Sequence, residues 1–394
     1  MISRIFLWNH RDRETRSILF GSLCHCASVV PFFIIAYFRQ ALYWRFTILV
    51  LFTSFRISAQ TLGGNSVFNF LKLSNTPQLT ALGGVNISQP SNDVGLAFNN
   101  PALLKPSMHS QLNAVFNDFY SGIKIYHLSL GYRNEKLNTN FSWGLNYLDY
   151  GNVSETDASG NVFGKFRPRD WVMQVSASRA YEEKWNYGAT LKFISSSYGQ
   201  YSSNGLALDI GILFNDSSKL FSASIVAKNM GTQLKKYDGS DGDDLPFELQ
   251  IGLTKRLAKA PFGFSLTAQR LQQFNINYND TVFNNENGFE NDNDKKFTFG
   301  KLINHFVFAT TIYLGDKVEV QAGYNFLRRK ELNIGNTGNG LNGFSMGAGV
   351  KLGKLQLRYA RAYYQNSSAF SQLGLNMKLN EYFGLGKWGE KIGW

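Results

Sequence analysis

The chain has 394 residues and a formal net charge of +12, with 17% charged and 15% aromatic residues. Soluble domains usually carry about 25% charged residues, and a mean hydropathy of −0.21 excludes a membrane protein built from long apolar helices. Low charge, many aromatics and 37 Gly favour a membrane barrel with an apolar wall and a polar lumen.

Residues 1–59 differ in composition from the rest and are predicted to be a leader. They hold both cysteines, seven Arg and no Lys. The apolar run Phe46–Phe55 follows a basic residue, which predicts a signal peptide cleaved after Ala59. An earlier run, Ile18–Phe38, is long enough to span a bilayer. Either the chain has a double leader or translation starts downstream of residue 1; we favour the later start, although the next methionine is Met108.

Cleavage would remove seven Arg, Asp12 and Glu14, leaving 33 basic and 26 acidic residues and a net charge of +7. The mature chain would then have no cysteine and no disulfide. Its His109, His127 and His305 are far apart in sequence, and we expect no metal and no cofactor. No basic helix or basic–aromatic block points to nucleic acid. Lipopolysaccharide phosphates or charges scattered in the lumen explain the positive charge better.

Residues 60–111 do not alternate in polarity. Their first apolar residues are spaced for one short amphipathic helix over 67–73, and turn-rich stretches follow at 81–84 and 97–104. A barrel of the size predicted below encloses more space than its strand side chains fill, and so many apolar residues would not stay solvated. We therefore predict that residues 60–111 form an N-terminal plug rather than a flexible periplasmic tail.

From Leu112 onward apolar and polar residues alternate with period two. Trp185, Tyr187 and Leu191, for example, alternate with Gly188, Thr190 and other small or polar residues. The polar positions are mostly Gly, Ser, Asn and Thr, as in a barrel lumen. The pattern predicts an all-β fold, a 14-stranded antiparallel transmembrane β-barrel over 112–380, whose strands are long enough to cross at a tilt of roughly 45°. The predicted strands are 112–119, 122–133, 139–149, 170–181, 184–195, 203–214, 220–229, 246–257, 262–275, 305–315, 317–327, 342–353, 355–364 and 369–380.

The connections alternate in length. Those after even-numbered strands are short, whereas long ones follow odd-numbered strands at 150–169, 230–245, 276–304 and 328–341. Bacterial barrels have short periplasmic turns and long external loops. We therefore predict a multi-pass protein of the cell outer membrane with both barrel ends periplasmic. Arg361 falls on the lipid-facing side, which is a misfit, and residues 381–394 form a C-terminal tail.

Two motifs resemble enzyme signatures. Residues 343–347 match the G-x-S-x-G nucleophile elbow, which requires a sharp strand-to-helix turn, yet here Ser345 lies inside an alternating strand. Residues 384–389 match a dinucleotide-binding pattern, but only five residues follow, so no βαβ unit can form. We expect no catalytic residue and no enzyme activity, and we expect Ser345→Ala to leave the function intact.

Charged clusters allow further readings. The acidic stretches 238–244 and 284–294 have oxygen ligands that calcium prefers, but they lack EF-hand spacing and are better explained as polar external loops. Five charged residues fall on the lumenal face and either line a pore or pair with other charges inside the barrel. We favour pairing for these residues, which are Lys192, Glu248, Glu319, Lys351 and Arg358.

Several segments resemble the PorV/PorQ family of outer-membrane barrels, itself similar to the FadL transporters. The N-terminal ones are Gly63–Leu71, Ala81–Gly84, Asp93-Val94 and Phe98–Ala102. Further segments are similar to the PorQ branch in particular: Lys228–Leu234, Leu245-Pro246 and Gly323–Arg329. The order and spacing of these motifs match the family over residues 61–380, whereas the leader and the tail depart from it.

The resemblance implies a non-enzymatic component of the type IX secretion system of Bacteroidota. In that family, PorQ members sit in the surface attachment complex with PorU, PorV and PorZ. They are thought to anchor PorZ, which presents anionic lipopolysaccharide to the sortase PorU. For this chain the resemblance implies a PorZ-like surface partner, with PorU and PorV in the same complex, in outer-membrane lipid and lipopolysaccharide. The alternatives are a FadL-like channel for hydrophobic small molecules and, third, a lipid hydrolase using Ser345.

An anchor barrel can offer a surface protein only its external loops and its rim. Loops this long are usually functional or disordered, and aromatic and Arg side chains make the best anchoring contacts. The candidate partner-binding residues are therefore Phe163, Phe166, Arg167 and Arg169 in the first long loop and Phe283, Phe289 and Phe297 in the third. The alternative is that these loops only cover the barrel mouth.

Overall fold

The computed structural model describes residues 66–276, 285, 297–332, 340–364 and 369–380. They form a closed barrel in which every neighbouring pair of strands is antiparallel. Strand β1 (Gln111–Asp118) closes the barrel, because it pairs with β2 (Lys124–Asn134) on one side and with β16 (Ala369–Lys378) on the other. The predicted leader and tail lie outside the described residues.

The predicted 14-stranded antiparallel barrel is confirmed. After β1 and β2, its strands are β3 (Thr139–Asp149), β6 (Arg169–Tyr181), β7 (Trp185–Tyr198), β8 (Tyr201–Asp216), β9 (Phe221–Lys235), β10 (Glu248–Arg256), β11 (Phe262–Ala268), β12 (Phe306–Leu314), β13 (Val318–Asn325), β14 (Phe344–Leu352), β15 (Leu355–Tyr363) and β16.

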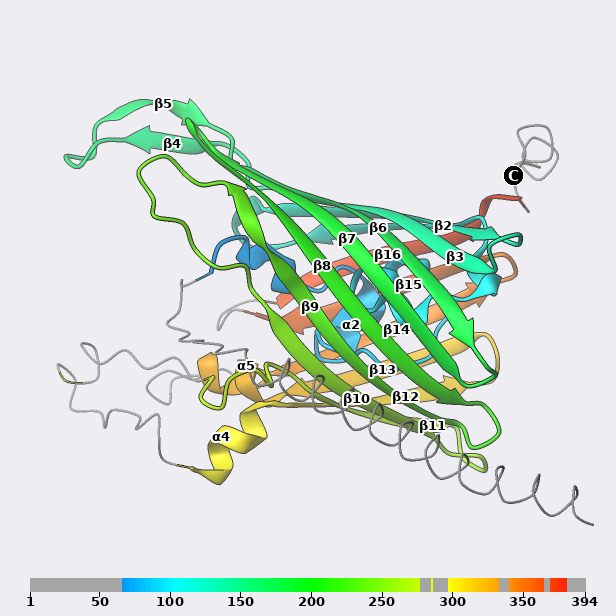
Figure 1. Ribbon diagram of the computed structural model, residues 1–394. Helices are drawn as coiled ribbons and strands as arrows, with labels where there is room; N and C mark the ends of the chain where they lie inside the picture. Colours follow the sequence, from blue (N-terminus) through cyan, green and yellow to red (C-terminus); the bar gives the residue numbers. More distant parts are fainter. Residues whose placement is uncertain (1–65, 277–284, 286–296, 333–339, 365–368, 381–394) are drawn as a thin grey trace, which may run out of the picture. The chain divides into compact units, whose positions relative to one another are not determined.

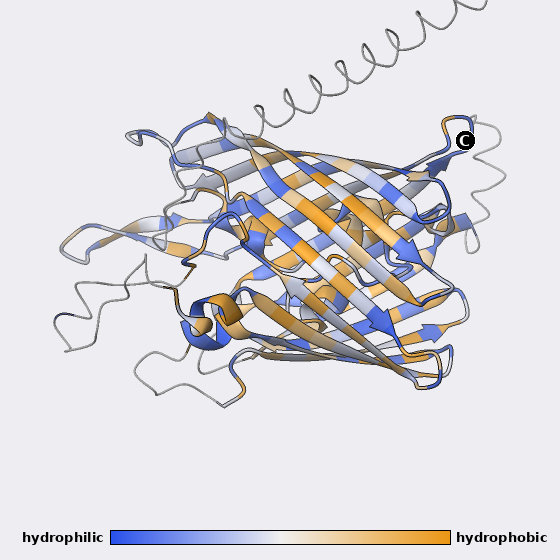
Figure 2. Ribbon diagram, turned by 60° about the horizontal axis from the view of Figure 1, so that its bottom comes forward, coloured by the Kyte–Doolittle hydropathy of each residue, from blue (hydrophilic) through white to orange (hydrophobic). Residues whose placement is uncertain are grey.

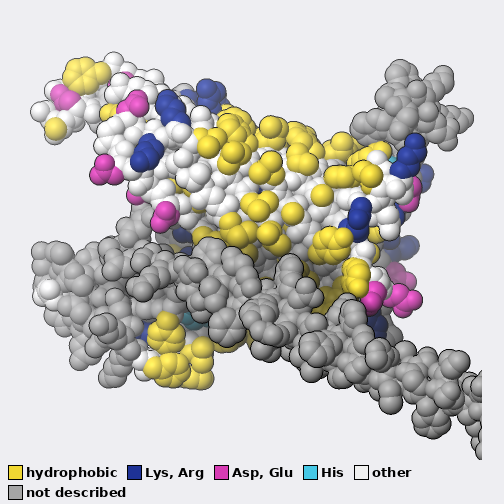
Figure 3. Space-filling view, viewed as in Figure 1, with side chains coloured by type: hydrophobic (Ala, Val, Ile, Leu, Met, Phe, Trp, Pro, Cys, Tyr) yellow, Lys and Arg dark blue, Asp and Glu magenta, His cyan; other side chains and the backbone are white. Residues whose placement is uncertain are grey.

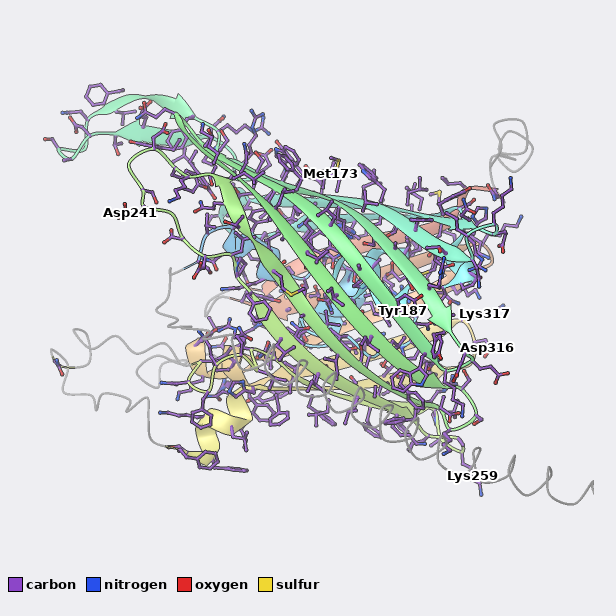
Figure 4. The ribbon with its side chains drawn as sticks, viewed as in Figure 1. Met173, Tyr187, Asp241, Lys259, Asp316 and Lys317 are labelled. Carbon is purple, nitrogen blue, oxygen red and sulfur yellow. The ribbon has the colours of Figure 1, made fainter. Side chains whose placement is uncertain are left out.

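The two ends of the barrel differ (Figure 1). At one, the turn end, turns of two to five residues join the strands, as at 135–138, 257–261 and 353–354. The other, the long-loop end, carries a two-stranded hairpin and two short helices. These are β4 (Val153–Thr156) with β5 (Val162–Phe166), α4 (Phe299–Asn304) and α5 (Phe326–Glu331). In Figure 4, Asp241 lies at the long-loop end and Lys259 and Asp316 lie at the turn end.

At the long-loop end three predicted strand boundaries are wrong and one predicted loop contains strands, each for a local reason. The loop 150–169 contains the β4–β5 hairpin. β11 ends before Gln269 because Arg270 has a left-handed φ of 53°. β13 gives way to α5 because the Asn325 side chain accepts a hydrogen bond from Arg328 N, a helix N-cap. β9 continues to Lys235 past a bulge at Asn229, whose φ is 56° and which reverses the alternation of side chains.

The wall has an apolar outer face and a polar inner face. On β7, Trp185, Tyr187 and Leu191 are exposed outside while Thr190 and Lys192 are buried inside. Figure 2 shows orange hydrophobic bands alternating with blue and white ones along the strands, and Figure 3 shows hydrophobic side chains over the strands with charges towards the two ends. Met173 and Tyr187 project from this outer surface in Figure 4. This is the wall of an outer-membrane type of barrel.

Arg361 does face outwards, as its strand parity indicated. It lies two residues before β15 ends at Tyr363, on the way to the long-loop end. A long Arg side chain near the membrane edge can extend its charged group into the polar layer. Among the described residues, no helix is long and apolar enough to cross a membrane.

Residues 66–110, here called the inner segment, run inside the barrel (Figure 1, blue to cyan). Their short helices are η1 (Asn69–Lys72), α2 (Pro77–Ala81), η2 (Val94–Phe98), η3 (Pro101–Leu103) and η4 (Pro106–Met108). The amphipathic helix expected at 67–73 is a single 3-10 turn over 69–72, because Phe68 before it has a left-handed φ of 56°.

The inner segment begins at the long-loop end and reaches the turn end. Ser66 forms a parallel bridge with Asp244 in the loop after β9. At the turn end, Gln89 Nε2 donates to the Tyr313 hydroxyl at 2.9 Å, near the end of β12. The chain then rises to Phe98, beside His127 of β2, and descends again to enter β1. The inner segment therefore spans the depth of the lumen.

Lumen-facing glycines let the inner segment lie directly against the wall. A Cβ atom on Gly323 of β13 would lie 2.3 Å from the backbone nitrogen of Gly83. One on Gly188 of β7 would lie 2.7 Å from the carbonyl carbon of Pro101. Any side chain at these positions would push the inner segment away from the strands.

Candidate functional site: the filled lumen and the long-loop end

An Arg fastens the inner segment to the wall in the half of the lumen nearer the turns. Arg358 Nη1 lies 2.8 Å from Asp93 Oδ2, and Arg358 Nε lies 2.8 Å from Glu319 Oε1. Arg358 is 5% exposed. Asp93 belongs to the inner segment and also accepts a hydrogen bond from Gly95 N at 2.9 Å, which starts η2. One guanidinium thus joins the inner segment to two wall strands.

A second buried ion pair, between Lys192 and Asp209, lies nearer the long-loop end. Lys192 Nζ is 2.5 Å from Asp209 Oδ2, and both side chains are fully buried. The Asn229 bulge shapes this pair, because Asn229 N donates to Asp209 Oδ1 at 2.7 Å and Lys192 Nζ donates to Asn229 Oδ1 at 3.0 Å. Lys228 Nζ donates to Asn99 Oδ1 of the inner segment.

Most of the charged residues predicted to face the lumen form ion pairs inside the barrel. Lys192, Glu319 and Arg358 are ion-paired as expected, and Glu248 is buried. Lys351 is exposed instead, because it is the second-last residue of β14 and the strand is leaving the barrel there. Asp93 was not among the expected charges. The sequence does carry a signal for Asp93, because it is the one acidic residue in the inner segment. A carboxylate that is buried in the lumen needs a cation as its partner.

Ser345 lies in the middle of β14 rather than at a strand-to-helix turn. Its hydroxyl donates to Ala81 O at 3.0 Å and accepts from Gly83 N at 3.0 Å. Both partners belong to the inner segment. The hydroxyl therefore holds the inner segment against the wall, and the geometry of a nucleophile elbow is absent at this residue.

At the long-loop end the inner segment is held by apolar contacts. Val67, Phe68, Phe70 and Leu71 pack in one buried cluster with wall residues such as Leu148, Val172 and Ile194. Beside them lies a cavity of about 290 Å³. Its aromatic lining comes from Phe68, Phe70, Tyr150, Tyr198 and Tyr237.

Hydrogen bonds hold the aromatic side of this cavity in place. The Tyr150 and Tyr198 hydroxyls donate to Asp170 Oδ2 at 2.6 Å and 2.8 Å. Burial, followed by the nearby Asp170 carboxylate, raises the pKa of Tyr150, which lies in the loop after β3. Tyr150 is therefore a neutral hydrogen-bond donor at physiological pH.

The first group of predicted partner-binding residues lies on or below the hairpin. Phe163 is 72% exposed near the tip, next to exposed Val162. Phe166 is half-buried with its ring near Gly199. Arg167 forms an ion pair with Asp149, which ties the hairpin to β3. Arg169 is exposed as the first residue of β6.

The second group is separate from the first. Phe297 is 65% exposed and stacks on Phe274, with ring centroids 5.6 Å apart. Phe283, Phe289 and the acidic stretch 284–294 apart from residue 285 lie outside the described residues. The hairpin joins β3 to β6, whereas Phe297 precedes β12, and six strands separate the two places around the barrel. The structure therefore does not bring Phe163 and Phe297 into one patch.

A second cavity, of about 170 Å³, also opens at the long-loop end. It lies between the inner segment and α5, and Arg270, Arg328 and Glu331 are among its lining residues. The sequence pattern did not single out these residues, because they follow strand ends where the alternation has stopped.

Comparison with known proteins gives similarity of fold only. No family model matches the chain, and no curated protein matches it. Among solved structures it is similar to the CymD monoaromatic hydrocarbon channel, with 12% identity over 79% of this chain and 97% of that chain and a TM-score of 0.44. It is similar to a TodX monoaromatic hydrocarbon channel mutant, with 12% identity over 77% and 98% and a TM-score of 0.43.

A third similar structure is a Pseudomonas aeruginosa FadL homologue, with 10% identity over 77% of this chain and 98% of that chain and a TM-score of 0.40. At these identities the likeness assigns neither substrate nor partner to this chain.

Proposed function

We propose that this protein is a non-enzymatic outer-membrane anchor for a surface protein, acting as a PorQ-type component of a type IX secretion attachment complex. The observation that carries the proposal is the filled lumen. Paired charges at Asp93–Arg358 and Lys192–Asp209 and backbone packing at Gly323 favour a rigid closed body over an open pore. The family resemblance of the sequence supplies the type of complex.

The hairpin is the proposed docking element for the PorZ-like partner. It projects from the rim (Figure 1) and every residue of β4 is exposed. Val162 and Phe163 expose apolar area that a partner would bury. The Arg167–Asp149 ion pair holds the base of the hairpin against β3, so the tip is presented in one orientation.

Replacing two side chains tests this docking. The variant Val162→Ser with Phe163→Ser is expected to release the PorZ-like protein from the cell surface into the medium. Immunoblots of cells and medium would measure the released fraction. Lys165→Ser, an exposed change on the same strand, is the matched control and should release none. Because β4 and β5 lie outside the barrel sheet, both variants should insert normally.

Shortening each long loop in turn extends the test. Replacing 276–304 by a tight turn asks whether the group around Phe297 docks the partner instead. If the surface protein stays bound in the hairpin variant and after each of the four loops is shortened, docking through one essential loop is wrong.

A specific observation favours a second candidate function, a FadL-like channel for hydrophobic small molecules. The 290 Å³ cavity beside Phe68 and Phe70, at the mouth of the barrel, is lined by aromatic rings and by polar residues such as Asp170, and aromatic rings are a common lining of small-molecule sites. For this function the inner segment has to move to open a route. Uptake of toluene by cells with and without the protein distinguishes the channel from the anchor. The channel is supported if cells with the protein take up toluene faster and if Phe70→Asp abolishes this difference.

A further inference from the structure

The 170 Å³ cavity at the long-loop end differs from its aromatic neighbour in chemistry. Charged side chains from four parts of the chain line it. Lys72 comes from the inner segment, Glu248 from β10 and Arg270 from the residues after β11, whereas Arg328 and Glu331 come from α5. Its volume has room for on the order of ten waters, which is ample for a small polar group.

Arg328 is the central side chain of this cavity. It is 8% exposed. Its Nη2 donates to Gly83 O at 3.1 Å, and its guanidinium lies 3.6 Å from the centre of the Tyr364 ring. These contacts fix the plane of the guanidinium. Its Nη1 is buried and has no hydrogen-bond partner among the described residues, an arrangement that is costly for a charged donor.

The balance of charge in the cavity is positive. Three cations, Lys72, Arg270 and Arg328, face two carboxylates, Glu248 and Glu331. One carboxylate is already engaged, because Arg270 Nη1 lies 3.6 Å from Glu331 Oε1. Burial raises the pKa of Glu331 and lowers the pKa of Lys72, which the charge of Arg270 lowers further. Both shifts come mainly from burial and reflect how far the cavity is shielded from water, so the positive balance rests on the number of cations that line it.

We propose that this cavity binds a phosphate group, held by the guanidinium of Arg328 and by Arg270 and Lys72. A planar guanidinium presents parallel donors that match phosphate oxygens. Cations outnumber carboxylates among the charged lining residues, which favours an anion over a cation as the occupant. At this end of an outer-membrane barrel the phosphate is either free in solution or carried by a lipid headgroup, and the chemistry of the site is the same for both.

Titration of the purified full-length protein with inorganic phosphate tests the proposal. Calorimetry at constant ionic strength, with chloride replacing phosphate, measures the dissociation constant. We expect Arg328→Met to weaken phosphate binding about tenfold or more, the size of a lost charged hydrogen bond. Arg270→Gln should weaken it as well, and Glu331→Gln should tighten it. Because Arg270 is partly exposed, its variant is expected to fold even where Arg328→Met does not.

Arg256→Met is the matched control. Arg256 also lies over an aromatic ring, that of Tyr313 at 4.1 Å, but near the turn end. It should leave phosphate binding unchanged. Adding lipid A in detergent micelles identifies the source: competition with phosphate indicates a headgroup, and no competition indicates free phosphate. The proposal is overturned if the wild-type protein binds no phosphate, or if Arg270→Gln and Arg328→Met bind it as tightly as the wild type.

Discussion

The inner segment is attached to the wall in two different ways along its path. At the long-loop end, Phe68, Phe70 and Leu71 pack among apolar wall residues and beside an aromatic cavity. Nearer the turn end, Asp93 meets Arg358 and Gln89 meets Tyr313 through polar contacts. The first half relies mainly on apolar packing, with a backbone bridge at Ser66–Asp244, whereas the second relies on paired polar groups with fixed geometry.

This difference indicates which half can move. Apolar side chains can slide or be replaced by an apolar ligand at modest cost, whereas a buried ion pair must be broken as a whole. The turn half is therefore expected to stay fixed while the long-loop half responds to partners or ligands. Changes in the two halves test this comparison.

The largest effect is expected from Arg358→Met. The change leaves the buried Asp93 and the partly buried Glu319 without their cation, and removing the partner of a buried charge typically costs about 3–5 kcal/mol. Urea unfolding of the barrel in detergent, followed by tryptophan fluorescence, measures the loss. Adding Asp93→Asn should recover part of it, because the amide still caps η2. Lys184→Met removes a half-exposed Lys from buried Asp216, which keeps hydrogen bonds from Ser218 Oγ and Lys219 N, and should therefore cost less than Arg358→Met; equal losses would contradict the assignment.

A smaller effect is expected from Phe70→Ala in the long-loop half. Phe70 is 6% exposed and meets Phe68 edge to face. Losing a buried ring at a site that can partly collapse should cost about 3 kcal/mol. The same urea titration measures it, and hydrogen exchange should speed up at 67–73 but not at 88–95. Exchange that rises equally in both segments would refute the independence of the two halves.

The smallest effect is expected from Gly323→Ala. The added methyl group would lie 2.3 Å from Gly83 N and 2.5 Å from Leu82 C, both backbone atoms that cannot rotate away. Overpacking of this kind costs about 2 kcal/mol. Gly300→Ala, where an added Cβ would meet nothing within 4 Å and the backbone is not left-handed, is the control without a close contact. Urea midpoints that change equally for both would mean that the close approach is unimportant.

The sequence predicted the wall well because period-two alternation is a local property. The strands β3, β6 and β7 start or end within a few residues of the predicted limits. The errors occur where local backbone geometry overrides the alternation, at the left-handed Asn229 and Arg270 and at the Asn325 cap. These single residues end or extend strands without leaving a mark on the polarity pattern.

The sites were less predictable than the wall. Asp93 and Arg358 are 265 positions apart, and no local pattern connects them. The alternation pattern does not predict the hairpin, because β4 and β5 are largely exposed on both faces and therefore show no alternation. The sequence did carry one usable signal. Glycines such as Gly188 and Gly323 occupy strand positions that face the lumen, where a closely packed inner segment leaves no room for a side chain.

The central claim is that the inner segment fills the lumen of a closed anchor. Ion conductance across planar bilayers containing the purified full-length protein tests it most directly. We predict no lasting open-channel steps for the wild-type protein, and brief openings for Arg358→Met, because that change loosens the turn half. Steady, porin-like conductance from the wild-type protein would contradict the account.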